Sequence, residues 1–408
     1  MSEFERVVQE AVALHDAGCY AQALALYDDA LSRWPDRFLL WNNRGNTLLE
    51  LSRYDAAAES YRRALQLVPA LHDARVALAS CLQATGRLDE ALAACDTVLR
   101  EMPEHAEAHW NRALVLLLQG KYPEGWREYE WRWKKRRFTS PLRQFHQPVW
   151  QGEPLAGKTI LVYAEQGFGD TLQFCRYLPL LAAGGAQVVF ECHPPLVALM
   201  ATVGADIHVV PMGQPLPFFD LHVPLLSLPR LFGTTLETIP HRVPYLQPPP
   251  DRLAFWQSVM PRDARRKVGL CWAGKTYPDP GRSIPVTTLS ALAGVTEVSF
   301  VSLQMGEGCE RPSLPLLDVT LLVRDFADTA AVVAQLDLVV TIDTAVAHLA
   351  GALGIPTLVL LPAAPDWRWG SDGDDCPWYP TMRLFRQRQA GQWSAVLERV
   401  VGVLRQRT

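Results

Sequence analysis

The first third of the chain repeats its pattern every 34 residues. A turn residue recurs at this spacing, and each copy has a small residue seven positions before it and five positions after it. Nine positions after the turn stands a tyrosine, or a cysteine in the third copy. In chain order these sets are Gly18, Ser52, Gly86 and Gly120; Ala11, Gly45, Ala79 and Ala113; Ala23, Ala57, Ala91 and Gly125; and Tyr27, Tyr61, Cys95 and Tyr129. A period of this length indicates stacked supersecondary units rather than one closed core.

Each unit reads as two antiparallel helices joined by a tight turn. Small residues on both helices allow close approach, and Pro35, Pro69 and Pro103 end the second helix of the first three copies. The pattern resembles the tetratricopeptide repeat and predicts about four copies over residues 1–137. The fourth copy has Arg132 where the others have a small apolar residue, as terminal repeats often differ.

Such an array presents a concave groove that commonly holds an extended peptide. We therefore predict a protein or peptide partner bound by the repeats. The alternative is an array that only packs against its neighbour and shapes the chain.

The rest of the chain alternates strands and helices. Residues 138–154 contain three prolines and are predicted to form a linker. A buried strand at 159–164, a glycine loop and a helix at 171–181 begin an α/β lobe over 155–245, and the alternation restarts after the proline-rich segment 245–250. The predicted fold is α + α/β, an all-α superhelix followed by two Rossmann-like lobes, the second at residues 250–408. Ligands bind such sheets beyond the carboxyl ends of the strands, so we expect a cleft between the lobes.

Composition excludes several other classes of protein. Lys and Arg number 39 against 43 acids, so binding to nucleic-acid phosphates lacks its main driving force. The eight cysteines show no C-x-x-C pair and no zinc spacing, as expected of buried thiols in a reducing compartment. The most apolar stretch, 349–365, is interrupted by prolines and glycines, so no membrane span is predicted. The N-terminal residues lack the apolar core of a secretory signal, and we expect a cytoplasmic protein.

The segment 339–356 contains the most informative motif. Asp343 and Thr344 end a predicted strand and open a helix, where free amides and the helix dipole suit a diphosphate. His348 lies one turn deeper on the same face and can donate to a phosphate oxygen. Alternatively, Asp343 caps the helix and His348 is a satisfied core residue.

This segment resembles the D-[TS]-G-x-x-H-[LV]-A-x-A-L-x-x-P pattern of ADP-heptose:lipopolysaccharide heptosyltransferases, glycosyltransferase family nine. The resemblance covers roughly residues 155–405 and implies the GT-B fold of two Rossmann domains, in outline similar to O-GlcNAc transferases. Asp366 and Trp367, in the segment that follows, look like the branch fused to tetratricopeptide repeats and are expected to contact donor or acceptor. One departure is Ala345, where the family usually has glycine, so close approach of a phosphate is in question.

The resemblance also implies a donor site in the second lobe. Lys275, Arg282 and Ser283 fall where the family binds donor phosphates, and two cations there can neutralise a departing diphosphate. Surface cations on a loop are the alternative. Gln304 and Glu307 fall where the family holds the nucleoside.

The first lobe supplies a possible base. Its loop Gln166, Gly167, Phe168, Gly169, Asp170 is neither a dinucleotide fingerprint nor a Walker loop. It resembles the family's strand-end G-[DE] motif, whose acid is regarded as the base for the acceptor hydroxyl, and Gln166, Gly167 and Gly169 are expected beside the substrates. Asp170 equally suits an ordinary helix N-cap, and Glu165 is the reserve candidate.

Together these features predict a bacterial-type glycosyltransferase. It would move a sugar from a nucleotide-diphosphate donor, its co-substrate, to a hydroxyl on a protein or peptide held by the repeats, with inversion and without a metal or cofactor. A lipid-linked or surface glycan is the alternative acceptor. The alternative function is a catalytically inactive scaffold or a nucleotide-binding interaction module.

Overall fold

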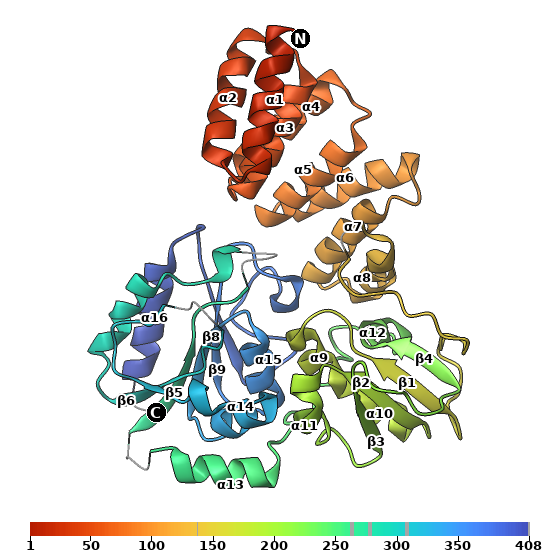
Figure 1. Cartoon of the computed structure of the whole chain (residues 1–408), viewed down its shortest axis with the longest axis vertical. Helices are drawn as coiled ribbons and strands as arrows, with labels where there is room; N and C mark the ends of the chain where they lie inside the picture. The colour runs from red at the N-terminus through yellow and green to blue at the C-terminus, as the bar shows by residue number, and fades with distance from the viewer. Residues whose placement is uncertain (137, 262–264, 276–279, 307–309, 407–408) are drawn as a thin grey trace. The chain divides into compact units, whose positions relative to one another are not determined.

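The computed structural model describes residues 1–136, 138–261, 265–275, 280–306 and 310–406. They fall into two compact units (Figure 1). The first unit contains residues 1–138 and 364–371, and the second contains residues 139–363 and 372–408.

The first unit is a stack of helix pairs. Its helices are α1 (Glu3–Asp16), α2 (Tyr20–Arg33), α3 (Phe38–Glu50), α4 (Tyr54–Leu67), α5 (His72–Ala84), α6 (Leu88–Glu101), α7 (Ala106–Leu118) and α8 (Tyr122–Tyr129). Each helix packs on the next one in the chain (Figure 1). The predicted helical repeats are confirmed.

The recurring small residues lie where the helices approach most closely. A Cβ added to Gly45 would lie 2.7 Å from a ring carbon of Tyr61, so no side chain fits there. The turn residues of the four copies all have a positive φ, including Ser52 at 55°. Glycine adopts this conformation without strain, which explains why it stands at the other three turns.

The second unit begins with a four-stranded parallel sheet, the core of the first α/β lobe. Its strands are β1 (Thr159–Tyr163), β2 (Gln187–Cys192), β3 (Ile207–Pro211) and β4 (Leu221–Pro224), in the order β3-β2-β1-β4. Its helices are α9 (Phe168–Phe174), α10 (Leu178–Ala183), α11 (Val197–Met200) and α12 (Leu228–Leu231). The proline-containing segment before β1 packs on this lobe, because Trp150 is buried and Arg143 lies 2.6 Å from the buried carboxylate of Glu191.

The second α/β lobe contains a six-stranded parallel sheet. Its strands are β5 (Arg266–Cys271), β6 (Val298–Ser302), β7 (Leu316–Asp318), β8 (Leu338–Ile342), β9 (Thr357–Leu361) and β10 (Met382–Arg386), in the order β10-β9-β8-β5-β6-β7. Its helices are α13 (Pro250–Val259), α14 (Phe326–Val333), α15 (Ala345–Ala352) and α16 (Trp393–Arg405). One face of the sheet buries Val268 and Leu270 against Leu397 and Val400 of α16. The predicted fold class, helical repeats followed by two Rossmann-like lobes, is confirmed.

One predicted helix boundary was wrong for a local reason. The helix expected at 171–181 begins at Phe168 and is interrupted at 175–177 by a 3-10 turn. Elsewhere α14 begins at Phe326, where the Asp325 carboxylate accepts hydrogen bonds from the amides of Ala327 and Asp328.

A buried arginine joins the two lobes of the second unit. The Arg176 guanidinium donates to the carbonyls of Pro240, at 3.2 Å, and Trp378, at 2.9 Å, and to the Tyr245 hydroxyl at 3.0 Å. Residues from the first lobe, the inter-lobe segment and the second lobe therefore share one cation. Because the guanidinium is fully satisfied by these acceptors and by aromatic rings, its burial is tolerated.

Candidate functional site

The carboxyl ends of β5 and β8 form the switch point of the six-stranded sheet. From β5 the chain continues to β6 on one side, and it later returns to β8 on the other side. The connections leave such neighbouring strands in opposite directions, and the crevice between them is where open α/β sheets bind ligands. Lys275 follows β5, and Asp343 and Thr344 follow β8.

Arg282 brings these predicted residues together. Its guanidinium donates to the carbonyl of Lys275 at 3.0 Å and to the carbonyl of Asp343 at 3.3 Å. A Cβ on Gly274 would lie 3.0 Å from Arg282 Nε, so the guanidinium packs directly on the loop backbone. Ser283 strengthens the same loop because its hydroxyl accepts a hydrogen bond from the Gly274 amide at 3.1 Å. Arg282 and Ser283 therefore act on the backbone that carries Lys275.

Lys275 and the start of α15 remain open to an anion. Lys275 is exposed, and no carboxylate within the described ranges pairs with its ammonium. Thr344 occupies the N-cap position, but its side chain does not cap the helix. Its hydroxyl instead lies 3.2 Å from the Thr341 hydroxyl. The first amides of α15, which begins at Ala345, thus lack the usual side-chain acceptor.

Gln304, expected near a nucleoside, is bound to the loop that follows β5. Its side-chain oxygen accepts hydrogen bonds from the amides of Trp272, at 3.0 Å, and Ala273, at 2.8 Å, while its side-chain nitrogen donates to the Ala273 carbonyl at 3.0 Å. The side chain therefore orders the loop after β5. Glu307, the other residue expected near a nucleoside, lies outside the described residues.

His348 lies at the contact between the two lobes. It is 4% exposed, and its Nδ1 lies 3.0 Å from the Tyr379 hydroxyl. A Cβ on Gly169 of α9 would lie 2.9 Å from His348 Cδ2 and 3.7 Å from the Cα of Ala345. Gly169 is therefore required for the close packing of α9 on α15, which Figure 1 shows side by side.

The first lobe has a corresponding switch point between β1 and β4. Glu165 follows β1, is 3% exposed, and accepts a hydrogen bond from the amide of Leu226, after β4, at 3.2 Å. The next residue, Gln166, has a φ of 62°, which is unusual for a residue with a side chain. Its amide donates to the Ser140 hydroxyl at 2.9 Å.

The alternative interpretation of the sequence placed Asp170 at the N-cap of α9, but Asp170 does not occupy that position. Gly167 occupies that position, and Asp170 stands three residues later, where its carboxylate accepts a hydrogen bond from the Gly167 amide at 2.8 Å. The carboxylate therefore reaches back over the first turn of its own helix. Asp170 is half-buried at the edge that faces the second lobe through Gly169.

His193 is a member of this site that the sequence analysis did not identify. It directly follows β2, and its Nδ1 lies 3.5 Å from the Thr171 hydroxyl. Burial lowers the pKa of His193, the nearby Asp170 carboxylate opposes this shift, and the Lys275 ammonium adds to it. Asp170 and Lys275, from different lobes, thus both act on one imidazole. The sequence signal that could have identified His193 is its place directly after a parallel strand. The carboxyl ends of all the parallel strands meet at one edge of the sheet, where the site lies.

Asp366 and Trp367 belong to the first unit. The Asp366 carboxylate accepts hydrogen bonds from the Arg368 amide, at 3.0 Å, and guanidinium, at 2.9 Å. Trp367 is 2% exposed, and its ring lies 5.2 Å from that of Trp126 and 6.3 Å from that of Tyr122. Both side chains therefore have structural partners within the repeat unit.

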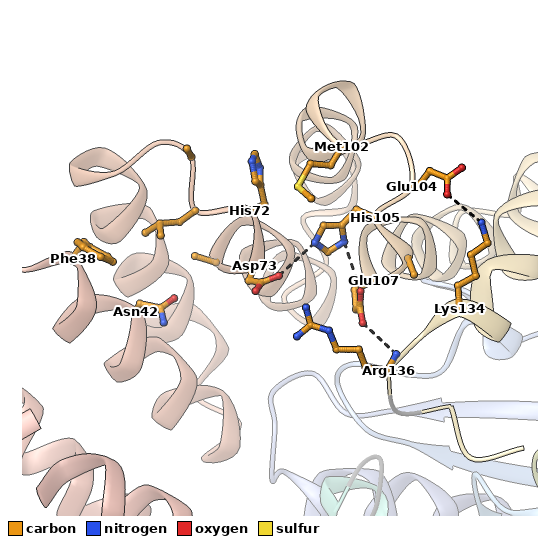
Figure 2. Close-up of a pocket in the computed structure, with 14 residues that line it drawn as sticks. Phe38, Asn42, His72, Asp73, Met102, Glu104, His105, Glu107, Lys134 and Arg136 are labelled. Carbon is orange, nitrogen blue, oxygen red and sulfur yellow. Dashed lines mark hydrogen bonds and ion pairs between the residues drawn. The ribbon is translucent and has the colours of Figure 1, made fainter. Parts of the chain in front are cut away.

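A separate groove lies in the repeat array. It encloses about 640 Å³ and is lined from the N-terminal ends of α3, α5 and α7. Figure 2 shows Asp73 and Glu107 on either side of His105, and Glu104 directed toward Lys134. His105 occupies the N-cap position of α7, where its Nδ1 accepts a hydrogen bond from the Ala108 amide at 3.3 Å. The exposed side chains of Phe38 and Met102 contribute apolar surface to the groove.

Two other classes of site were searched for. Among the described residues, no three His, Cys, Asp or Glu side chains gather as a metal ion would require. No described helix has both the length and the apolar character needed to cross a membrane.

Comparison with known families finds matches in the repeat region and in the second α/β lobe. Residues 8–72 and 48–117 each match a family described as tetratricopeptide repeat. Residues 307–393 match glycosyltransferase family 9 (heptosyltransferase).

Individual proteins resemble either the whole chain or one part of it. Protein FlbA of Caulobacter vibrioides is 29% identical over 429 aligned residues, which cover 97% of this chain and 72% of FlbA. A glycosyl transferase family 9 structure from Veillonella parvula is 12% identical, with a TM-score of 0.46, over 58% of this chain and 88% of that one. A tetratricopeptide repeat protein from Parabacteroides merdae is 23% identical, with a TM-score of 0.30, over 31% of this chain and 51% of that one.

Proposed function

We propose that this chain, which combines tetratricopeptide repeats with a glycosyltransferase family 9 domain, transfers a sugar from a nucleotide-diphosphate donor to a hydroxyl acceptor. The observation that carries the proposal is the junction made by Arg282. By binding the carbonyls of Lys275 and Asp343, it holds an exposed ammonium beside the uncapped start of α15. An ammonium and free helix amides are the groups that bind a diphosphate.

The proposed reaction is a single displacement with inversion. The acceptor oxygen forms a bond to the anomeric carbon as the bond from that carbon to the diphosphate oxygen breaks. The electron pair of the broken bond leaves with the diphosphate, and the hydroxyl proton passes to the Asp170 carboxylate. Lys275, Arg282 and the α15 dipole stabilise the charge that develops on the departing group, and we propose that no metal ion is needed.

The groove of the repeat array supports a polypeptide acceptor. Its apolar side at Phe38 and Met102 and its flanking carboxylates suit an extended segment with both apolar and polar side chains. A lipid-linked or surface glycan is the second candidate acceptor.

A specific observation favours a non-catalytic alternative. The Asp170 carboxylate is engaged by the Gly167 amide, so the proposed base already has a structural role. In this alternative the second lobe binds a nucleotide without turnover, and the repeats assemble partners.

A binding and turnover screen tests the proposal. The full chain is titrated by calorimetry with UDP, GDP, ADP and dTDP, and release of the nucleoside diphosphate from the matching sugar donors is then followed with and without EDTA. We expect one nucleotide to bind, and slow donor hydrolysis that EDTA does not change. Binding without hydrolysis or transfer favours the scaffold, and no binding to any of them contradicts both functions.

Adjacent variants in α3 test the acceptor proposal. Phe38 and Leu39 are each 38% exposed, but only Phe38 lines the groove. We expect Phe38→Asp to reduce transfer to a polypeptide acceptor about tenfold while donor hydrolysis is unchanged, because it places a charge on an apolar contact. Leu39→Asp is the matched control, and equal losses in both variants would exclude the groove as the acceptor site.

A further inference from the structure

One backbone carbonyl and two side chains at the start of α9 contact His193. An imidazole N–H donates to the carbonyl of Gln166, its Nδ1 lies 3.5 Å from the Thr171 hydroxyl, and its ring meets that of Phe168 edge-to-face at 5.1 Å. Gln166 precedes the N-cap of α9, whereas Phe168 and Thr171 belong to the first residues of the helix, so the contacts hold both the turn and the helix start. His193 itself lies on another segment, directly after β2.

The turn needs such an anchor. Gln166 adopts a φ of 62°, a conformation that costs a residue with a side chain free energy and persists only when its surroundings hold it. The next amide, that of Gly167, binds the Asp170 carboxylate. A relaxed Gln166 would move this amide, and the carboxylate would move with it.

The surroundings of His193 favour a neutral ring. Burial is the largest influence and lowers its pKa, and the charged groups acting on it are Asp170 from α9 and Lys275 from the loop after β5. The neighbouring helix α14 begins with Phe326, whose ring packs on Phe168 at 5.2 Å. The acids of that helix end, Asp325 and Asp328, form ion pairs with Arg252.

We propose that His193 is a positioning residue that holds the strained Gln166 turn and thereby sets the Asp170 carboxylate at the edge facing Lys275. The role assigned to Asp170 rests on the proposed function, whereas the anchoring of the turn does not. His193 acts here as a hydrogen-bond donor and a packing surface, not as the proton acceptor.

Two substitutions separate anchoring from proton transfer. His193→Gln keeps an N–H donor for the Gln166 carbonyl but cannot take up a proton near neutral pH, whereas His193→Ala loses both properties. Hydrogen exchange of the amides of residues 166–170 is measured in the full chain, because it needs no donor or acceptor. We expect exchange about tenfold faster in His193→Ala and close to the parent rate in His193→Gln. Unchanged exchange in His193→Ala would overturn the proposal.

Turnover with the donor found by the screen gives the second measurement. We expect kcat to fall about 10- to 100-fold in His193→Ala, with the KM for the donor nearly unchanged, because misplacing a reacting group mainly slows the chemical step. His193→Gln should restore kcat to within about threefold of the parent. Equal loss of kcat in both variants would overturn the positioning role and assign proton transfer to the imidazole.

If the protein turns over no donor, the proposed function is refuted. The hydrogen-exchange measurement still tests the role of His193 in that case. A proton NMR titration of the His193 ring adds an independent check on the cluster. Its pKa should rise in Lys275→Ala and fall in Asp170→Asn, and a pKa insensitive to both would contradict the geometry from which the anchoring is inferred.

Discussion

The two α/β lobes have the same strand order around their switch points but different chemistry there. β3-β2-β1-β4 in the first lobe corresponds to β7-β6-β5-β8 in the second. In the first lobe a buried carboxylate, Glu165, spans the switch point by accepting the Leu226 amide. In the second lobe a guanidinium, Arg282, spans it by donating to two carbonyls. The topology supplies a crevice in both cases, and the residues that follow the strands decide which charge it holds.

The helices that follow the two crevices, α9 and α15, also differ in the charge that their first turns hold. The first turn of α9 carries its own acid, because Asp170 reaches back to the Gly167 amide. Thr344, at the N-cap of α15, does not cap its helix in this way, because its hydroxyl faces Thr341. One helix start is therefore neutralised internally, and the other is suited to an external anion.

The largest effect that would test this comparison is expected for Asp170→Asn. The amide oxygen of asparagine can still accept the Gly167 amide, so the helix start should keep its geometry while the proton acceptor is lost. We expect transfer to fall by about 10²- to 10⁴-fold, with donor affinity unchanged. Initial rates and calorimetry measure the two quantities, and normal turnover would refute the role of base.

Removing the cation of the second lobe should have the next largest effect. Lys275→Ala should weaken nucleoside-diphosphate binding by more than tenfold, or about 1.4 kcal/mol, because an exposed ammonium at the crevice is lost. Lys267→Ala is the matched control, since Lys267 lies near the amino end of β5, the strand that Lys275 follows. If both variants bind equally well, the anion site is not at the carboxyl end of β5.

The contact between the two helix starts can be tested by stability. Gly169→Ala places a methyl group against the buried His348 ring, so we expect the free energy of unfolding to fall by about 1–3 kcal/mol. Gly402→Ala in α16 is the control, because nothing lies within 4 Å of its added Cβ and alanine favours a helix by about 1 kcal/mol. Urea unfolding measures both, and a neutral Gly169→Ala would mean that α9 and α15 pack less closely in solution.

The smallest expected effect concerns the pH dependence of the first lobe. Burial lowers the pKa of His222, which is 4% exposed and lies on β4. Between its ordinary value and this lowered value the unfolded chain binds more protons than the folded one, so the free energy of unfolding falls as the pH decreases below about 6.5.

His222→Gln should make this fall shallower, as measured by urea unfolding at a series of pH values. The exposed His208 of β3 provides the control substitution, His208→Gln. Parallel pH profiles in the parent and His222→Gln would show that His222 does not contribute to the acid sensitivity of this lobe.

Local patterns allowed much of the fold to be predicted. The 34-residue period places small residues on facing helices, and in the structure these residues are buried between the helices. Strand–helix alternation and the residues after β5 and β8 indicated the crevice, because parallel strands end at one edge. The boundary of α9 was wrong since Asp170 can cap from within the first turn as well as from before it.

Other features depend on partners far along the chain. Gln304 contacts Ala273 from 31 positions away, so its role in ordering that loop could not be recognised from its position after a strand. His193 meets Thr171 across 22 positions, and only its place directly after β2 hints at a role in the site. Trp367, expected beside the substrates, is buried among aromatic side chains of the repeat unit.

By itself the sequence determined the periodic elements: helix pairs, buried parallel strands and the polar residues that follow them. These depend on spacing and side-chain size within a few turns of chain. Only the tertiary structure decided which polar groups stay open to a ligand and which bind the backbone. Lys275 is an example of the first kind, and Gln304 is an example of the second. The physical reason is that a hydrogen-bonding group is satisfied by whichever donor or acceptor folding brings within about 3 Å, and that partner is set by long-range packing.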